Sequence, residues 1–240
     1  MRLFCMPFAG GSAKDFRKWQ EFLRPGIEVC AVELPGRGGR LKETPFDLID
    51  PLLDTLELNL FRELDRPFAF FGHSFGGLLA FELAHRLSAS GVHPVHLFVS
   101  GRCAPQTPTE LPFRHDSPEA MLLKELRKLG GTPIQVLEDA ELMRLLLPAL
   151  RADLAVLESY NYRGERPKLT CPISAFGGVH DPIVKPAMYD AWRQLTLSSF
   201  SLELFPGGHF FFQKEQTTFL ETLVRHLRGR HGPQPESLVK

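Results

Sequence analysis

Residues 66–84 read RPFAFFGHSFGGLLAFELA, with an apolar strand-like run, a glycine-flanked serine and a helix-like run in direct succession. The motif G-x-S-x-G in this setting is typical of a nucleophile elbow, a tight strand-to-helix turn that raises a serine hydroxyl above the end of a sheet. Such a turn forces Ser74 toward a positive φ, and Gly72 and Gly76 lie where a Cβ would collide with the neighbouring strand or helix. We therefore predict that Ser74 is a nucleophile; an ordinary glycine-rich turn is the alternative.

Six short apolar runs predict the strands of a sheet. Most are nearly continuous in apolar residues, as expected of central parallel strands that are covered on both faces. Helix-like segments separate most of them, so the alternation favours an α/β fold with an open, mostly parallel sheet. The predicted strands are 2–6, 27–34, 67–71, 95–100, 172–176 and 201–205, and the helices between them include 51–64, 78–88 and 187–194.

The alternation stops between residues 101 and 172. Two helical patterns, 118–129 and 139–159, occupy this stretch, and no strand is expected there. We expect one domain over 1–230, with a helical insertion at about 105–165 that acts as a lid over the sheet edge carrying the elbow. A separate helical packing unit without a role in the site is the alternative.

The first of these helices has clear boundary signals. We expect Ser117 to cap its amino end, Pro118 to lie in its first turn and the glycine pair 130–131 to end it. The second carries leucines spaced three and four residues apart, as in an amphipathic helix. A last amphipathic helix at 216–228 closes the domain, and we expect the polar, proline-containing tail 231–240 to be disordered.

The composition favours a globular protein of a reducing compartment. Lysine plus arginine and aspartate plus glutamate number 28 each, so no overall field attracts nucleic acid or an acidic membrane surface. The apolar run at the amino terminus is too short for a signal peptide, and no window is long enough to span a membrane. The cysteines are widely spaced without a metal-binding pattern, and we expect reduced, mostly buried thiols. They are Cys5, Cys30, Cys103 and Cys171.

Two later loops carry the partners that a serine nucleophile needs, a base that removes its proton and an acid that orients the base. Enzymes with such an elbow follow the chain order serine, acid, histidine. His209 fits the base because it follows the strand 201–205 through a proline-glycine-glycine loop. Asp181 fits the acid because it follows the strand 172–176, whereas the loop after the preceding strand holds no carboxylate near the strand end. The alternatives are a structural loop histidine and an aspartate that only caps the following helix.

The reaction also needs backbone N–H donors for an oxyanion. One is predicted at Phe75, the residue after the nucleophile. The other should come from the glycine-rich loop PFAGGSA at 7–13, whose glycines let the backbone approach the reacting carbon closely. We assign this donor to Ala9, with Phe8 as the neighbouring candidate; a simple strand–helix turn is the alternative for the loop.

These segments in combination resemble the type II thioesterases of polyketide and nonribosomal peptide synthesis and the related medium-chain acyl-carrier-protein thioesterases. The resemblance extends from Leu3 to about Leu227 and is most particular in the early glycine loop and the segment LPGR. The motifs are PFAGGSA at 7–13, LPGR at 34–37, GHSFGG at 72–77, GVHDP at 178–182 and PGGHFF at 206–211. Family members often carry tyrosine or histidine in place of Phe8, methionine in place of Phe75, and a more acidic run than 38–40.

The resemblance implies an α/β-hydrolase fold and an enzyme that removes misprimed or stalled acyl groups from the phosphopantetheine arm of carrier proteins. By the same resemblance the catalytic residues are Ser74, Asp181 and His209, and the oxyanion amides are those of Ala9 and Phe75. No metal or bound cofactor is implied, because the substrate itself brings the phosphopantetheine. The expected partners are acyl or peptidyl carrier protein domains, without nucleic acid or membrane, and we expect a cytoplasmic monomer.

Two other functions stay open: a serine esterase or lipase acting on small oxygen esters, and an inactive hydrolase fold that serves as a binding module. The triad alone does not select thioesters over esters. Phenylalanines 210–212 beside the base form either an acyl channel or, as we expect for each, ordinary core. Basic residues of the insertion either meet an acidic carrier protein or, as we expect, form a solvated face. They are Arg114, Lys124, Arg127, Lys128, Arg144 and Arg151.

Overall fold

The central sheet of the computed structural model is parallel throughout, with the strand order β2-β1-β3-β4-β5-β6. The structure describes residues 1–108 and 111–228. The strands are β1 Arg2–Met6, β2 Glu28–Ala31, β3 Phe68–His73, β4 His96–Ser100, β5 Ile173–Gly178 and β6 Phe200–Phe205. Because all six run the same way, the loops that follow their carboxyl ends meet at one edge of the sheet. The predicted sheet is confirmed, although β2 is shorter than the expected 27–34, and the predicted disordered tail lies outside the described residues.

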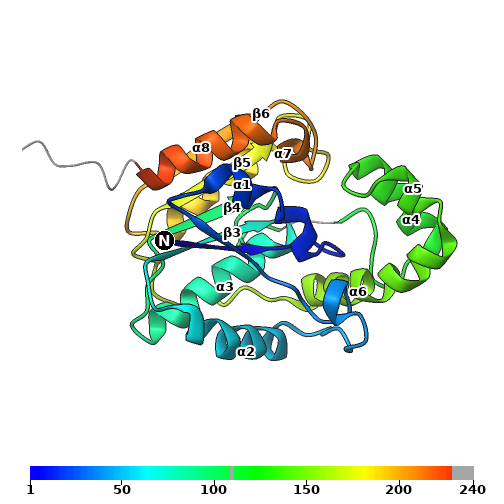
Figure 1. Ribbon diagram of the computed structural model, residues 1–240, viewed down its shortest axis with the longest axis horizontal. Helices are drawn as coiled ribbons and strands as arrows, with labels where there is room; N and C mark the ends of the chain where they lie inside the picture. The colour runs from blue at the N-terminus through cyan, green and yellow to red at the C-terminus, as the bar shows by residue number, and fades with distance from the viewer. Residues whose placement is uncertain (109–110, 229–240) are drawn as a thin grey trace, which may run out of the picture.

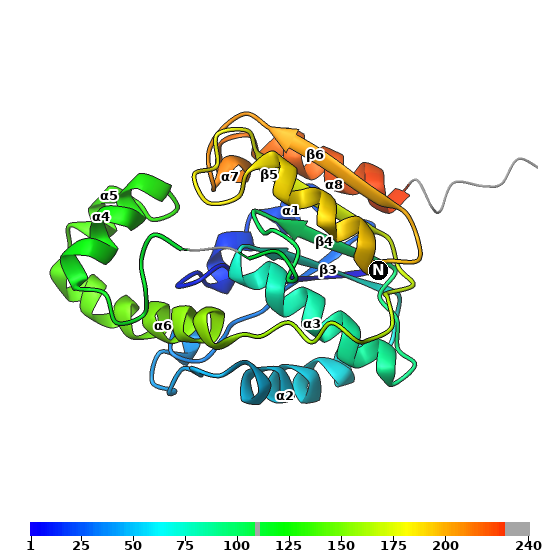
Figure 2. The same cartoon turned by 180° about the vertical axis from the view of Figure 1, so that it is seen from behind.

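Helices cover both faces of the sheet (Figures 1 and 2). Alternate side chains of β1 are buried on opposite faces: Leu3 and Cys5 belong to one apolar cluster, and Phe4 and Met6 belong to the other. Two buried faces explain the nearly continuous apolar runs in the strands. One face is covered by α2 Ile49–Leu60, α3 Phe75–Ala89 and the 3-10 helix Pro186–Leu195, and the other by α1 Trp19–Leu23, α7 Phe211–Lys214 and α8 Gln216–Arg228.

Between β4 and β5 the described residues form no strand of the sheet, as expected, and three helices where two were predicted. They are α4 Glu119–Leu129, α5 Ile134–Leu137 and α6 Ala140–Ser159. Figure 1 shows these helices in green, projecting beyond the sheet, with α6 running back toward it. They share an apolar cluster of their own that includes Leu122, Leu137 and Leu154. The insertion is therefore packed both internally and, through α6, against the rest of the chain.

The helix boundaries were predicted with two errors and several omissions. Gly130 ends α4 in the left-handed conformation with φ 77°, as expected. Ser117 does not cap α4: Pro118 occupies the N-cap, and the Ser117 hydroxyl instead accepts a hydrogen bond from the Arg114 N–H. The predicted α-helix 187–194 is a 3-10 helix, and the short helices α1, α5 and α7 were not predicted, because segments of four or five residues carry too little periodicity.

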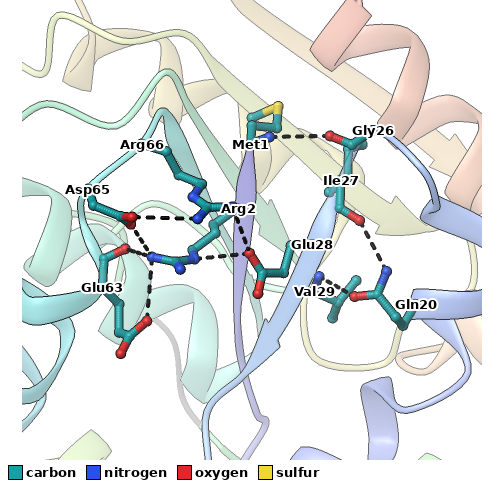
Figure 3. A network of polar contacts seen from close by, with 10 residues as sticks. All are labelled: Met1, Arg2, Gln20, Gly26, Ile27, Glu28, Val29, Glu63, Asp65 and Arg66. Atoms are coloured by element: carbon teal, nitrogen blue, oxygen red, sulfur yellow. Dashed lines mark hydrogen bonds and ion pairs between the residues drawn. The ribbon is translucent and has the colours of Figure 1, made fainter.

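At the opposite edge of the sheet, Arg2 connects β1 to its neighbours (Figure 3). Its Nε donates to Glu28 Oε2 at 3.1 Å, and its Nη1 contacts Asp65 and the Glu63 carbonyl. Arg2 is buried while its acidic partners are exposed, so the network mainly satisfies the guanidinium and fixes the start of β1 beside β2.

Among the described residues, no helix is both long and apolar enough to cross a membrane.

The turn between β3 and α3 is closed by two glycines. A Cβ on Gly72 would lie 2.0 Å from the Gly76 carbonyl oxygen, and a Cβ on Gly76 would lie 2.1 Å from the Met6 carbonyl oxygen. Both obstacles are backbone atoms, which cannot rotate away as a side chain can. The elbow glycines are therefore required by the approach of α3 to the ends of β1 and β3.

We predict that Gly76→Ala lowers the free energy of unfolding by at least about 3 kcal/mol, since the added methyl must push α3 away from β1. Gly39→Ala is the matched control, because no atom lies within 4 Å of its Cβ, and it should change stability by less than about 0.5 kcal/mol. Urea denaturation of the two variants measures both values. Equal stability of the two would contradict the proposed close approach.

Candidate active site

Ser74 lies at the turn between β3 and α3 in a strained backbone conformation, with φ 52° and ψ −111°. Among the described non-glycine residues it alone has a positive φ. Its N–H donates to the Ser100 carbonyl at 2.7 Å, and its carbonyl accepts from the Gly77 N–H at 3.0 Å. These bonds to β4 and to α3 hold the strain, which costs about 1–3 kcal/mol. The predicted positive φ is confirmed, and the serine stands at the amino end of a 15-residue helix.

Asp181 and His209 form a buried hydrogen-bonded pair. His209 Nδ1 lies 2.7 Å from Asp181 Oδ2, and both side chains are at most 3% exposed. The second carboxylate oxygen, Oδ1, accepts from the N–H groups of Ile183 and Val184 at 2.8 and 3.1 Å. The aspartate thus fixes its own loop with one oxygen and the imidazole with the other, whereas the following 3-10 helix has Lys185 as its N-cap and is not capped by Asp181.

The loops that carry this pair are joined to each other. The N–H of Val179 donates to the Phe205 carbonyl at 3.0 Å, and that of His180 donates to the Gly207 carbonyl at 2.9 Å. A Cβ on Gly178 would lie 2.2 Å from the Gly208 carbonyl oxygen, so only glycine permits this approach. The parallel pairing of β5 with β6 therefore continues into the loops and delivers acid and histidine together.

Ser74 and His209 line the same cavity, whose volume is about 40 Å³. Its lining is otherwise apolar apart from Thr132, and most of it comes from the insertion. The insertion contributes Leu111, Phe113, Leu126, Leu129, Gly131, Thr132, Leu150, Leu154 and Leu157. The structure thus brings the serine and the histidine to the wall of one apolar chamber.

The aromatic residues of the motifs divide between cavity and core. Phe8 and Phe210 line the cavity, with ring centroids 4.7 Å apart. Phe211 and Phe212 are 1% exposed and belong to the core on one face of the sheet. Phe75 is fully buried in the other core cluster, so its side chain, unlike that of Phe8, does not line the cavity.

His73 was not predicted to contribute to the site, yet its ring lies 4.9 Å from that of His209. It is fully buried, and its Nδ1 lies 2.9 Å from the Ser100 hydroxyl. Burial, and then the proximity of His209, hold the pKa of His73 well below 6.5. The ring therefore supports the second histidine without adding a positive charge beside it. Its place inside the G-x-S-x-G motif was the available signal.

The early glycine loop is fastened by two further residues. The Gly10 N–H donates to Asp153 Oδ2 at 2.8 Å, and the Gly11 carbonyl accepts from Arg37 Nη1 at 3.2 Å. Ala9, the candidate oxyanion donor, precedes Gly10 and lines the cavity. Burial raises the pKa of Asp153, while the hydrogen bonds from Arg37 and Gly10 act against that rise. Asp153 was missed because a lone carboxylate in a leucine-rich helix carries no motif.

Half of the six basic residues of the insertion are engaged within the chain. Arg114 lies 3.1 Å from Glu158, Lys128 lies 2.6 Å from Glu125, and Arg151 Nη1 donates to the Ser117 carbonyl at 3.0 Å. All four cysteines of the chain are free thiols, as predicted, and three of them are buried. Among the described residues, no group of three histidine, cysteine, aspartate or glutamate side chains is arranged to hold a metal ion.

Comparison with known proteins gives a consistent result over nearly the whole chain. A family model described as "Thioesterase domain" matches residues 1–230. The gramicidin S biosynthesis protein GrsT of Aneurinibacillus migulanus is 44% identical over 229 residues, which cover 95% of this chain and 89% of that protein. Thioesterase PikA5 of Streptomyces venezuelae is 37% identical, over 100% of this chain and 85% of its own length. The solved type II thioesterase BorB of the borrelidin cluster superimposes with a TM-score of 0.87 at 42% identity, covering 95% of this chain and 92% of BorB.

We predict that His73 makes stability depend on pH. Since its folded pKa lies well below 6.5, the unfolded chain binds more protons at mildly acidic pH, and the free energy of unfolding falls as the pH drops below about 6.5. One such proton contributes a slope of at most about 1.4 kcal/mol per pH unit. In urea denaturation between about pH 7.5 and about pH 5.5, His73→Gln should therefore lose stability less steeply than the unaltered protein. Identical slopes would show that His73 takes up its proton in the folded state.

Proposed function

The chain belongs to the thioesterase domain family, and we propose that Ser74 is its nucleophile. It is an enzyme of the α/β-hydrolase fold and is similar to type II thioesterases of polyketide and nonribosomal peptide synthesis. The substrates that we propose are misprimed or stalled acyl groups on the phosphopantetheine arm of acyl or peptidyl carrier proteins. The observation that carries the proposal is the buried pair of Asp181 and His209, whose histidine lines the same apolar cavity as the strained serine.

In the proposed acylation step, His209 Nε2 takes the hydroxyl proton while Ser74 Oγ attacks the thioester carbonyl carbon. Asp181 accepts from Nδ1–H, which fixes the tautomer and stabilises the imidazolium. The N–H groups of Ala9 and Phe75 hold the oxyanion of the tetrahedral intermediate. Its collapse breaks the carbon–sulfur bond, and the imidazolium returns the proton to the departing thiol.

The acyl-serine is then hydrolysed by the same groups. His209 takes a proton from water, the hydroxide oxygen bonds to the ester carbonyl carbon, and collapse of the second intermediate returns the proton to Ser74 Oγ. The products are the free acid and the regenerated serine. The overall reaction consumes one water molecule and releases the acid and the thiol, and the phosphopantetheine enters and leaves as part of the substrate.

We also propose that the helical insertion at about 105–165 acts as a lid and as the acyl-binding wall. Leucines of α4 and α6 form much of the apolar lining, which supports this role over that of an independent packing unit. The cavity of about 40 Å³ is far smaller than the roughly 300–1,000 Å³ of most ligand pockets. Short acyl groups should therefore be released fastest, and longer ones should require the insertion to move outward.

The proposed partner is a carrier protein, and the proposed location is the cytoplasm. Reduced thiols in a chain of this family support the location. Arg114 and Lys128 are exposed although each pairs with a glutamate of the chain, whereas Arg151 is partly buried and donates to the Ser117 carbonyl.

We predict that the protein releases acid from a short-chain acyl carrier protein faster than it cleaves the same acyl group from p-nitrophenol. Ser74→Ala should lower the rate by about 10⁶-fold, because the nucleophile is lost. A strong ester rate without turnover of the carrier thioester would favour the esterase alternative. Failure of a fluorophosphonate to label Ser74 in the folded protein would favour the inactive binding module.

Asp181→Asn tests the acid with little change of structure. The asparagine oxygen can still accept from Ile183 and Val184, but its NH₂ group faces His209 Nδ1 and imposes the wrong tautomer. We predict a fall in kcat of about 10⁴-fold, with a similar KM. Steady-state kinetics on the acyl carrier protein give both constants, and a kcat near that of the unaltered protein would remove Asp181 from the proposed triad.

A further inference from the structure

A second buried carboxylate, Asp153, forms a bidentate ion pair with Arg37. Arg37 Nη1 donates to Asp153 Oδ2 at 2.6 Å, and Nη2 donates to Oδ1 at 2.8 Å. The two side chains are 2% and 3% exposed. Arg37 and Asp153 are 116 residues apart in the chain, and their side chains are nearly inaccessible to water.

Each member of this pair also bonds to the backbone of the early glycine loop. Asp153 Oδ2 also accepts the Gly10 N–H at 2.8 Å, and Arg37 Nη1 also donates to the Gly11 carbonyl at 3.2 Å. Gly10 has φ 73°, a left-handed conformation that glycine adopts without the steric cost of a Cβ. The Ala9–Gly10 peptide unit is thus hydrogen-bonded to the Asp153 carboxylate, which Arg37 holds in place.

Three separate parts of the fold meet at this point. Gly10 follows β1, Arg37 follows β2, and Asp153 lies near the middle of α6 in the insertion. On the same helix, Leu150 and Leu154 line the cavity. The helix that forms part of the acyl wall therefore also supplies the acceptor for the loop with the candidate oxyanion donor.

Stability alone is a weak reason for the pair. Desolvation of two buried charges offsets most of their attraction, and apolar residues of similar volume often replace such pairs without loss of stability. A bidentate pair does fix geometry, because the planar guanidinium and the carboxylate allow one arrangement. The value of the Arg37–Asp153 pair therefore lies in what it orients.

We propose that the Arg37–Asp153 pair is a positioning device for the oxyanion hole, which orients the Ala9 N–H through the hydrogen bonds to Gly10 and Gly11. The inference rests on the proposed function, since it presupposes that Ser74 reacts and that the Ala9 N–H holds the oxyanion. The site is then complete only while α6 packs against the early glycine loop, because this one helix both lines the proposed acyl cavity and positions the oxyanion donor.

Asp153→Asn is the first test, with acyl carrier protein as substrate. One amide oxygen cannot accept from Gly10 and from both Arg37 nitrogens, and its NH₂ group opposes the guanidinium. We expect kcat to fall by at least about 10-fold, approaching the roughly 10²-fold loss of one oxyanion donor, with KM changed less than about threefold. The ground-state thioester does not need the oxyanion donor, so binding should persist.

The double variant Arg37→Met/Asp153→Leu keeps the test decisive if the buried unpaired charge of the single variant unfolds the protein. It replaces the pair by apolar side chains and removes the acceptor of the Gly10 N–H. Circular dichroism and thermal midpoints establish the fold, and kinetics are then measured well below the midpoint. We expect the same fall in kcat; an unchanged kcat, or a rise in KM alone, would overturn the positioning role.

Glu82→Gln is the matched control. Glu82 on α3 accepts from Arg166 Nη1 and Nη2 at 2.7 and 2.6 Å, a similar mostly buried bidentate pair that does not line the cavity. It also accepts from the hydroxyl of Tyr160 at the carboxyl end of α6, a bond that the glutamine oxygen can keep. It should lose stability but keep kcat. Turnover by the unaltered protein, with a silent Ser74→Ala, tests the proposed function itself; if that turnover is present, a normal kcat in the Arg37 and Asp153 variants overturns only the present inference.

Discussion

The site depends on the approach of three backbones at the carboxyl ends of β1 and β3. Gly76 at the start of α3 leaves no room for a Cβ against the Met6 carbonyl, and Gly72 leaves none against Gly76. Because β1 and β3 are hydrogen-bonded neighbours, this packing puts Ser74 beside the loop that leaves β1. Chain connections from β1 and β3 depart on opposite sides of the sheet, and the crevice at such a reversal is where α/β proteins bind ligands.

Around that crevice, polar groups removed from water are arranged so that each serves more than one partner. Asp181 holds its own loop with one oxygen and His209 with the other. Asp153 accepts from both the loop after β1 and Arg37. Buried carboxylates are costly unless fully hydrogen-bonded, and full bonding leaves them little freedom to rotate. The hydrogen bonds that offset the cost of burying these carboxylates also hold them in one orientation, so that they can position neighbouring groups.

Local sequence predicted the features that are governed by local sterics. The positive φ of Ser74 and the left-handed Gly130 follow from where glycine and a tight turn are needed. The six strands follow from apolar runs, and the pairing of Asp181 with His209 follows from the parallel order, which sends both loops to one edge. The catalytic roles of these residues stay predictions until the variants are measured.

Contacts between distant segments were beyond the sequence. Gly10 and Asp153 are 143 residues apart, and nothing near either residue indicates the other. Arg37 stood in the segment LPGR, yet its role depends on a partner in the insertion. The packing of His73 against His209 appears only when β3 and the loop after β6 are placed in space. Ser117 was misassigned because its hydroxyl bonds to the preceding turn instead of the helix.

The position of Asp153 limits how the helical segment between β4 and β5 can be exchanged among relatives. A grafted segment would bring its own leucines to the cavity, but without an acid at the same turn of α6 it would leave the Gly10 N–H and Arg37 buried without their partner. The segment therefore cannot be exchanged independently of the residues that it contacts in the rest of the chain. Divergence is freer on its outer face, where Leu142 and Leu145 are 42% and 48% exposed, so recombinant enzymes with new chain-length preferences should be built by altering single wall residues while the helix backbone is kept.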